Sequence, residues 1–107
     1  MSWKPISETE LQKELQSASS RMSLEQASLW KKVKVVPEKW AQEPYGNEGN
    51  GFWIVGILNH NVIWYNDIEE GFNLSPFTTE GRMDEYWCNQ DQLEWVLQHI
   101  IDQEGNN

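Results

Sequence analysis

The strongest signal for the fold lies in residues 52–65, FWIVGILNHNVIWY, at the centre of the 107-residue chain. The two halves of this stretch, 52–58 and 62–65, are rich in β-branched and aromatic residues, which is the composition of strands. The connector 59–61 is short, and Asn59 tolerates the left-handed backbone of a tight turn. The stretch therefore predicts a β-hairpin.

Both faces of this hairpin are apolar. Because side chains alternate along a strand, residues 52–58 divide into two sets. The sets are Phe52, Ile54 and Leu58 on one side, and Trp53, Val55 and Ile57 on the other. An antiparallel sheet with a wet face shows polar residues there, so something covers both faces. Three covers are open: the two helical regions on one face each, a second copy of the chain, or a partner on an exposed aromatic surface.

Helical signals flank the hairpin. Ser7 with Glu10 predicts a capping box, followed by apolar residues at helical spacing. Ser23 with Gln26 can start a second helix, and the pattern leaves open whether residues 7–31 form one bent helix or two. Asn89 is expected to cap a C-terminal helix over 89–103, which has a broad apolar face.

Short strands and turns fill the rest of the chain. Residues 33–36 predict a strand that Pro37 ends, because proline cannot donate to a ladder. Residues 41–51 are dense in turn formers, and 72–77 and 82–87 are expected to add two strands. The prediction is one α+β domain over 1–107: helical 7–31, β-rich 33–87 and helix 89–103. Its antiparallel sheet has about four to five strands, with the N-terminal helical region and the C-terminal helix packed on it.

The charge of the chain is unevenly placed. The net charge is −9, and residues 41–107 carry one arginine against twelve acidic residues. Contacts to phosphate need clustered Lys and Arg, so neither nucleic acid nor an anionic membrane is an expected partner. Such a field favours a basic protein and speeds the encounter with it. Acidity that serves solubility alone is the competing interpretation.

Motifs that carry chemistry are sparse. Cys88 is the single cysteine, which excludes an internal disulfide. With no secretory signal and no apolar run long enough to span a bilayer, a cytoplasmic location is expected. Cys88 and His60 could pair as nucleophile and base, but a lone cysteine among aromatic residues is more often a small buried hydrophobe. No cofactor and no metal site are expected, and a binding role is favoured over an enzymatic one.

The most distinctive segment is the acidic loop 66–71, which has aromatic residues on both sides. Aromatic side chains ringed by charge are typical of the energetic centre of an interface. The predicted contact set is Trp64, Tyr65, Asp67, Glu69, Glu70, Phe72, Phe77, Glu80, Asp84 and Glu85.

These features predict a non-enzymatic, acidic protein–protein interaction domain that engages a basic partner. The small, acidic, tryptophan-rich composition resembles that of immunity-like inhibitors and of small acidic mimics of DNA, and this resemblance implies an inhibitor. Two alternatives remain. One is a small enzyme or a ligand- or metal-binding domain that uses the carboxylates of Asp67, Glu69 and Glu70. The other is a structural homodimer.

Overall fold

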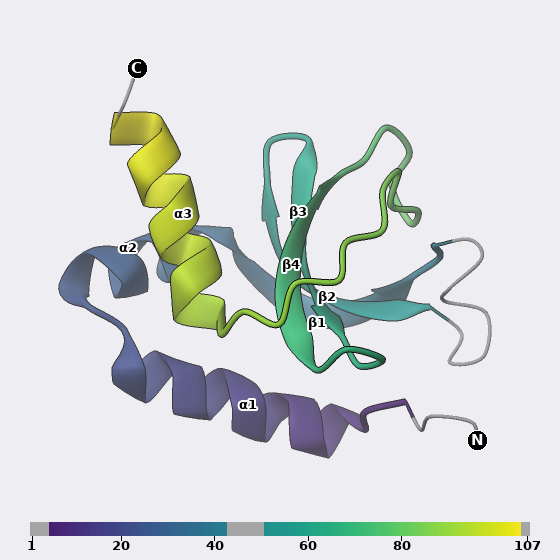
Figure 1. The fold of residues 1–107 in the computed structure, drawn as a ribbon, viewed down its shortest axis with the longest axis horizontal. Helices are drawn as coiled ribbons and strands as arrows, with labels where there is room; N and C mark the ends of the chain where they lie inside the picture. Colours follow the sequence, from purple (N-terminus) through teal and green to yellow (C-terminus); the bar gives the residue numbers. More distant parts are fainter. Residues whose placement is uncertain (1–4, 43–50, 106–107) are drawn as a thin grey trace.

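A computed structural model describes residues 5–42 and 51–105 of the chain. Within these ranges the elements, in order, are α1 (Glu8–Arg21), α2 (Leu24–Val33), β1 (Lys34–Trp40), β2 (Phe52–Leu58), β3 (Asn61–Asn66), β4 (Gly71–Pro76) and α3 (Leu93–Gly105). The four strands form one sheet in the order β1-β2-β3-β4, and every pairing is antiparallel. The predicted α+β class, with helices packed on an antiparallel sheet, is confirmed (Figure 1).

The N-terminal helical region consists of two helices, each with the predicted capping box. The Ser7 hydroxyl accepts from the backbone N–H of Glu10 at 3.1 Å, and the Glu10 carboxylate accepts from the N–H of Ser7. Ser23 and Gln26 repeat the arrangement at the start of α2. Met22, between the helices, has extended backbone angles, so the chain turns there and α2 starts in a new direction.

Asn89 does not cap the last helix, so that prediction is wrong. The helix begins four residues later, at Leu93. The side chain of Asn73 holds the backbone of Asn89 instead: its amide donates to the Asn89 carbonyl at 3.0 Å and its oxygen accepts from the Asn89 N–H at 2.9 Å. These two bonds tie the residue to β4 and keep it out of the helix.

The predicted hairpin is formed by β2 and β3, and Asn59 in its turn has a positive φ of 56°. A bulge interrupts the pairing, because Ile54 lies opposite Trp64 whereas Gly56 lies opposite Ile63. The extra residue in β2 shifts the alternation by one position.

The faces predicted for the end of β2 are consequently exchanged. Leu58 packs on the same side as Trp53 and Val55, and Ile57 packs on the other side. The sequence predicts side chains that alternate strictly between the two faces of the sheet, and the bulge interrupts this alternation.

The first strand also differs from its prediction. Val33 is the last residue of α2, and β1 continues through Pro37 to Trp40. This strand is at the edge of the sheet, and its register shifts between Lys34 and Glu38. An edge strand with an irregular register tolerates the missing N–H of proline.

Two apolar cores lie on the two faces of the sheet. The first, beneath the helices, is built around Leu11, Ala18, Trp30, Val33, Val55, Ile63, Tyr65, Phe72, Leu93, Val96, Leu97 and Ile100. The second contains Trp40, Phe52, Ile54, Val62, Trp64 and Met83, with Phe77 and Tyr86 packed against it.

The expectation that the helical regions cover one face each is therefore wrong. All three helices contribute to the first core, and the coil after β4 supplies the cover of the second (Figure 1). The predicted strand 82–87 lies in this coil and forms isolated bridges at most. Its apolar residues cover the sheet face and do not extend the sheet. Most of the predicted loop 41–51 lies outside the described residues.

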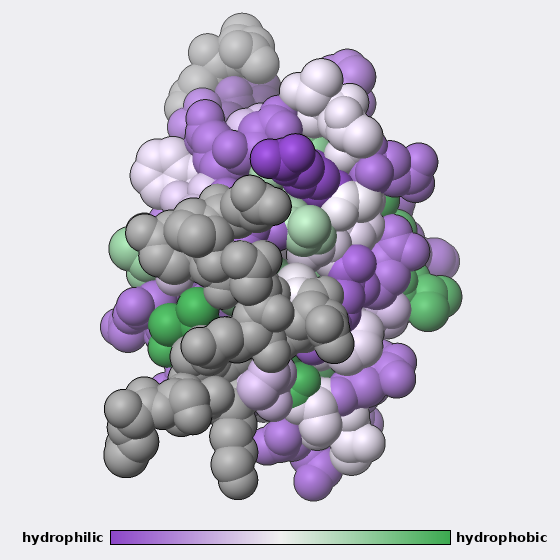
Figure 2. Space-filling model, turned by 90° about the vertical axis from the view of Figure 1, so that its right-hand side faces the viewer, coloured by the Kyte–Doolittle hydropathy of each residue, from purple (hydrophilic) through white to green (hydrophobic). Residues whose placement is uncertain are grey.

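The surface carries few apolar areas on the side shown in Figure 2, where hydrophilic side chains predominate among the coloured residues. None of the helices within residues 5–42 and 51–105 has the length and apolar character that crossing a bilayer requires.

Candidate functional site: an acidic groove that ends at two tryptophans

A hollow of about 310 Å³ lies between α1 and the turn that joins β3 to β4. We call it the acidic end; its lining residues are Pro5, Ile6, Glu10, Glu14, Tyr65, Asp67 and Glu70. Helix α1 contributes two carboxylates spaced four residues apart, which places them on one face of the helix. The side chain of Asn66 shapes the turn by accepting from the backbone N–H groups of Ile68 and Glu69. Four carboxylates thus converge from two elements.

Tyr65 lines this hollow and is 92% buried, since its exposed fraction is 8%. Its ring packs edge-on against Phe72, with the ring centroids 4.9 Å apart. No hydrogen bond joins its hydroxyl to another residue of the described part of the chain. Burial raises the pKa of Tyr65 to about 12, and the negative charges of nearby carboxylates raise it further, with Glu14 and Glu70 the strongest. The hydroxyl therefore sits in a negative field without a partner.

Asp67 faces inward and holds the lead into α1. Its Oδ2 accepts from the backbone N–H of Ile6 at 2.7 Å, and the indole N–H of Trp53 donates to the Ile6 carbonyl at 3.1 Å. Its Oδ1 is buried without a hydrogen-bond partner among the described residues. Burial raises the pKa of Asp67, although the bond from Ile6 acts in the opposite direction. Asp67 is thus a structural contact as well as a charge in the hollow.

The acidic end continues into two further hollows. A middle hollow of about 390 Å³ shares Glu14, Tyr65 and Glu70 with it. Asp91 lines both the middle hollow and a third one of about 580 Å³ beside β4, which we call the aromatic end. The aromatic end is lined by Asn73, Leu74, Pro76, Glu85, Trp87, Asn89, Asp91, Trp95, Val96 and His99. We refer to the three linked hollows as the acidic groove.

Two tryptophans stand half exposed at the aromatic end. The exposed fraction is 47% for Trp87 and 58% for Trp95, whereas the other described tryptophans are buried or half-buried. The indole N–H of Trp87 donates to Glu85 at 3.1 Å, which fixes the ring beside a carboxylate. Trp95 and His99 lie one turn apart on α3 and face the same side.

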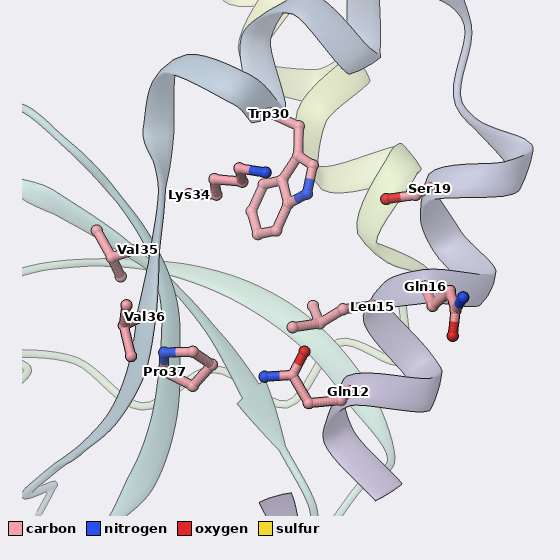
Figure 3. A pocket seen from close by; sticks show the side chains of 9 residues that line it. All are labelled: Gln12, Leu15, Gln16, Ser19, Trp30, Lys34, Val35, Val36 and Pro37. Carbon is pink, nitrogen blue, oxygen red and sulfur yellow. The ribbon is translucent and has the colours of Figure 1, made fainter. Parts of the chain in front are cut away.

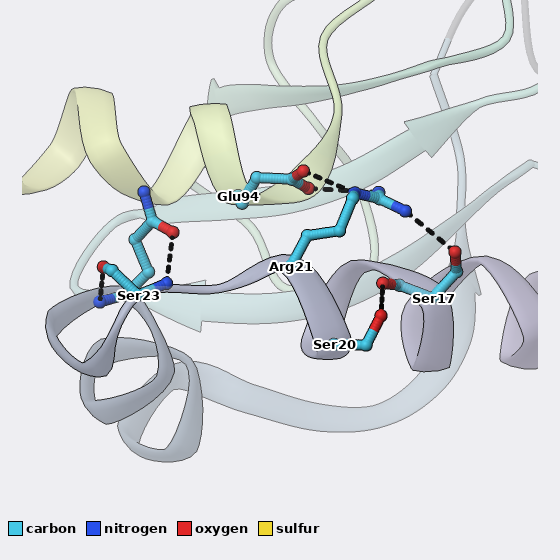
Figure 4. Close-up of polar contacts among 6 residues, drawn as sticks. Ser17, Ser20, Arg21, Ser23 and Glu94 are labelled. Atoms are coloured by element: carbon cyan, nitrogen blue, oxygen red, sulfur yellow. Dashed lines mark hydrogen bonds and ion pairs between the residues drawn. The ribbon is translucent and has the colours of Figure 1, made fainter.

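The walls of the groove are joined by an ion pair between α1 and α3 (Figure 4). Arg21 donates from Nε to Glu94 at 2.6 Å and from a terminal nitrogen at 3.2 Å. The side chain of Glu94 is only 7% exposed and that of Arg21 is 37% exposed. Burial by itself would raise the pKa of Glu94. The hydrogen bond from Arg21, a backbone hydrogen bond and the charge of Arg21 together outweigh burial, so the pKa of Glu94 is lowered.

The coil that carries Trp87 and Asp91 is fixed to the sheet. The backbone N–H of Phe72 donates to the Asp91 carbonyl at 2.8 Å, and the amide of Asn66 donates to the Trp87 carbonyl at 2.9 Å. Gly71 allows this approach, because a Cβ there would lie 2.4 Å from the carbonyl oxygen of Asn89. Hydrogen bonds to β3 and β4 therefore hold the backbone of the aromatic end against the sheet.

The structure brings together part of the contact set predicted from the sequence. Tyr65, Asp67 and Glu70 meet at the acidic end, and Glu85 lies at the aromatic end. Phe72 is 3% exposed and touches the groove only along its middle hollow.

The remaining predicted residues do not meet there. Trp64 is fully buried in the second core, where its indole N–H donates to Ser75 at 2.8 Å. Phe77 packs edge-on against Trp40 in the same core. The other three line none of the three hollows: they are the half-buried Glu69 and the exposed Glu80 and Asp84. Trp64 therefore presents no surface to a partner, contrary to its place in the predicted contact set, because its indole fills the second core.

Several groove residues were missed from the sequence although signals for some existed. Glu10 and Glu14 have the spacing of one helical face. Trp95 and His99 fall outside the apolar stripe of their helix, so an exposed indole could have been expected there. Nothing in the sequence near Trp87 distinguishes it from a core aromatic residue.

Another hollow, of about 550 Å³ and so similar in size to the aromatic end, lies between α1 and β1 (Figure 3). Its walls are Gln12, Leu15, Gln16, Ser19, Trp30, Lys34, Val35, Val36 and Pro37. Among the described residues its lining includes one cation and no carboxylate, so the concentration of negative charge singles out the acidic groove.

The candidates for thiol chemistry lie on separate segments, and the described residues form no metal-binding cluster. Over 5–42 and 51–105 no three His, Cys, Asp or Glu side chains are grouped so that they could hold a metal ion. Cys88 is exposed as a free thiol on the coil. His60 lies in the turn between β2 and β3, with its ring centroid 6.5 Å from that of Phe77.

Comparison with known proteins adds no relative. A scan against models of protein families and searches of curated proteins and of solved structures find no match to this chain.

Proposed function

We propose that the protein is a non-enzymatic interaction domain whose acidic groove binds a basic segment of a partner protein. The observation that carries this proposal is the convergence of Glu10, Glu14, Asp67 and Glu70 around the buried side chain of Tyr65. Within the described ranges none of these four carboxylates is in an ion pair. A cation from a partner would add counter-charge to the charges of Lys39 and Lys13, which already act on Asp67 and Glu10. Its approach would be steered by the acidic field.

The partner class follows from charge complementarity. A surface that binds phosphates is lined by Lys and Arg. An acidic groove is complementary to such a surface, so an inhibitor of a nucleic-acid-processing protein fits this geometry. Association of this kind should weaken as salt rises, because exposed charges are screened within roughly 10 Å at 0.1 M salt and roughly 3 Å at 1 M.

The experiment that tests the proposal compares charge reversal inside and outside the groove. Glu14→Lys/Glu70→Lys changes two exposed groove carboxylates, and Glu25→Lys/Glu104→Lys changes two exposed carboxylates elsewhere by the same net charge. Binding of a hexalysine peptide and of the partner recovered from lysate is measured at several salt concentrations. We expect the groove variant to lose about tenfold or more in association rate at low salt, as for steered encounters. Equal effects of the two variants would refute the proposal.

A second candidate is a site for a small cationic ligand, in line with the alternative raised by the carboxylate cluster. The observation that favours it is Asp67, whose Oδ1 is buried and unpartnered beside the hollow and whose pKa is raised by burial. Raised carboxyl pKa values in a hollow are characteristic of functional sites. Thermal-shift measurements with simple amines and diamines test it: a rise in melting temperature that Glu70→Gln removes would support it, and no rise at saturating amine would refute it.

A further inference from the structure

The aromatic end has features that the charge of the groove does not explain. Trp87 and Trp95 come from different elements, and both indoles remain about half exposed while lining the same hollow. Large exposed aromatic side chains are costly in water and are enriched at the centre of interfaces. A ligand that only neutralises carboxylates would leave both rings without a role.

Carboxylates accompany these rings. Glu85 and Asp91 line the hollow together with the tryptophans, and no arginine or lysine among the described residues lines it. Glu85 accepts a hydrogen bond from the indole of Trp87, so its carboxylate lies beside the ring. The hollow therefore offers flat aromatic faces beside negative charge, which is the environment that attracts a cation over a ring.

From this combination we propose that the aromatic end binds an arginine side chain of the partner, an inference that rests on the proposed function. A guanidinium group is planar and weakly hydrated, so it stacks on an indole while its edge donates paired hydrogen bonds to a carboxylate. A lysine ammonium is compact and strongly hydrated, and it cannot combine stacking with a forked contact. The hollow of about 580 Å³ is large enough to admit the whole side chain.

The edge of β4 gives the bound chain a backbone contact as well. The N–H of Phe72 donates to the carbonyl of Asp91, and the carbonyl of Pro76 accepts from the N–H of Asp84. Every second residue of β4 therefore points its backbone N–H and carbonyl away from β3. Leu74 lies between the two and lines the aromatic end. By the same alternation its backbone groups face outward, where one residue of the partner can pair with them between the positions that the coil already occupies.

The test compares hexaarginine with hexalysine peptides, which carry the same formal charge. For the native chain we expect hexaarginine to bind about tenfold more tightly, in keeping with stacking of a cation on indole. Trp87→Ala/Trp95→Ala should abolish this preference, because it should lower hexaarginine affinity about tenfold more than hexalysine affinity. Trp95→Phe, a milder change at an exposed position, should retain part of it. Circular dichroism establishes that each variant is folded.

The outcomes separate this inference from the proposed function. Equal affinity of the native chain for both peptides, or an arginine preference that survives in the double tryptophan variant, would overturn the inference alone. Glu14→Gln/Glu70→Gln should weaken both peptides equally. Failure of both peptides to bind at low salt would overturn both proposals. Salt-independent binding of cellohexaose that the tryptophan variant abolishes would assign the rings to a neutral sugar and refute the arginine assignment.

Discussion

Removing the guanidinium of Arg21 should destabilise the protein and make its stability depend on pH in a new way. Arg21→Ala deletes two charge-assisted hydrogen bonds, at 2.6 and 3.2 Å, and leaves Glu94 buried without its partner. Breaking a fully buried pair costs about 3–5 kcal/mol. Because the Arg21 side chain is 37% exposed, water can reach the vacated side. We expect a loss of about 2 kcal/mol in the free energy of unfolding at neutral pH.

The pH dependence has a definite sign. In the native chain the pKa of Glu94 lies below its ordinary value of 4.5, so the pair adds stability above that pH and the contribution is lost as pH falls through the lowered pKa. In Arg21→Ala only the backbone hydrogen bond at Glu94 still opposes the effect of burial, so the pKa of Glu94 should be higher than in the native chain. The destabilisation should therefore be large at pH 7 and should shrink toward pH 3.

Urea unfolding followed by tryptophan fluorescence measures both effects. Lys13→Ala, which removes an exposed cation from the same helix, is the matched control and should cost less than about 0.5 kcal/mol. In a Glu94→Gln background the cost of Arg21→Ala should be reduced, because the buried charge is gone. A loss at neutral pH no greater than that of the control, or one that is unchanged at pH 3, would refute this account of the pair.

Three further predictions follow from the packing and the hydrogen bonds. Gly71→Ala should cost about 2 kcal/mol in urea unfolding, because its Cβ would meet the backbone oxygen of Asn89; a neutral effect would show that the approach is not tight. Ser75→Ala should cost about 1–3 kcal/mol by leaving the buried indole N–H of Trp64 unpaired, and full stability would contradict that bond. In an ultraviolet titration Tyr65 should ionise with a pKa of about 12, above the ordinary 10.0. The free energy of unfolding should therefore fall as pH rises between these values. If the transition of highest pH is still present in Tyr65→Phe, it does not belong to Tyr65.

The fold could be predicted well wherever a local signal determined the structure. Both capping boxes are short-range patterns in which side chain and backbone satisfy each other, so Ser7 and Ser23 marked the helix starts correctly. The turn at Asn59 followed from the backbone that asparagine tolerates. The prediction that Asn89 caps a helix was wrong because asparagine is common both at helix caps and in coil. The side chain of Asn73 on β4, which bonds the backbone of Asn89, decides between the two, and its position is not evident from the sequence.

The site was less predictable because it depends on long-range packing. Asp67 and Glu70 were identified, but their partners on α1 lie more than fifty residues away in sequence. The strong aromatic signal at Trp64 was assigned to a surface, and the structure places it in a core. The bulge at Gly56 had no sequence signature beyond the glycine itself, and it exchanges the faces of the residues that follow it.

The irregular cover of the second core has a consequence for motion. Coil without its own ladder opens more easily than a packed helix, so the region over Trp64 should exchange its amide protons through sub-global opening well before the helical side does. The same coil carries Trp87 and Asp91. A partner that binds these two residues would stabilise the coil against opening. Binding in the groove would therefore slow the hydrogen exchange of the amides over the second core, on the other face of the sheet.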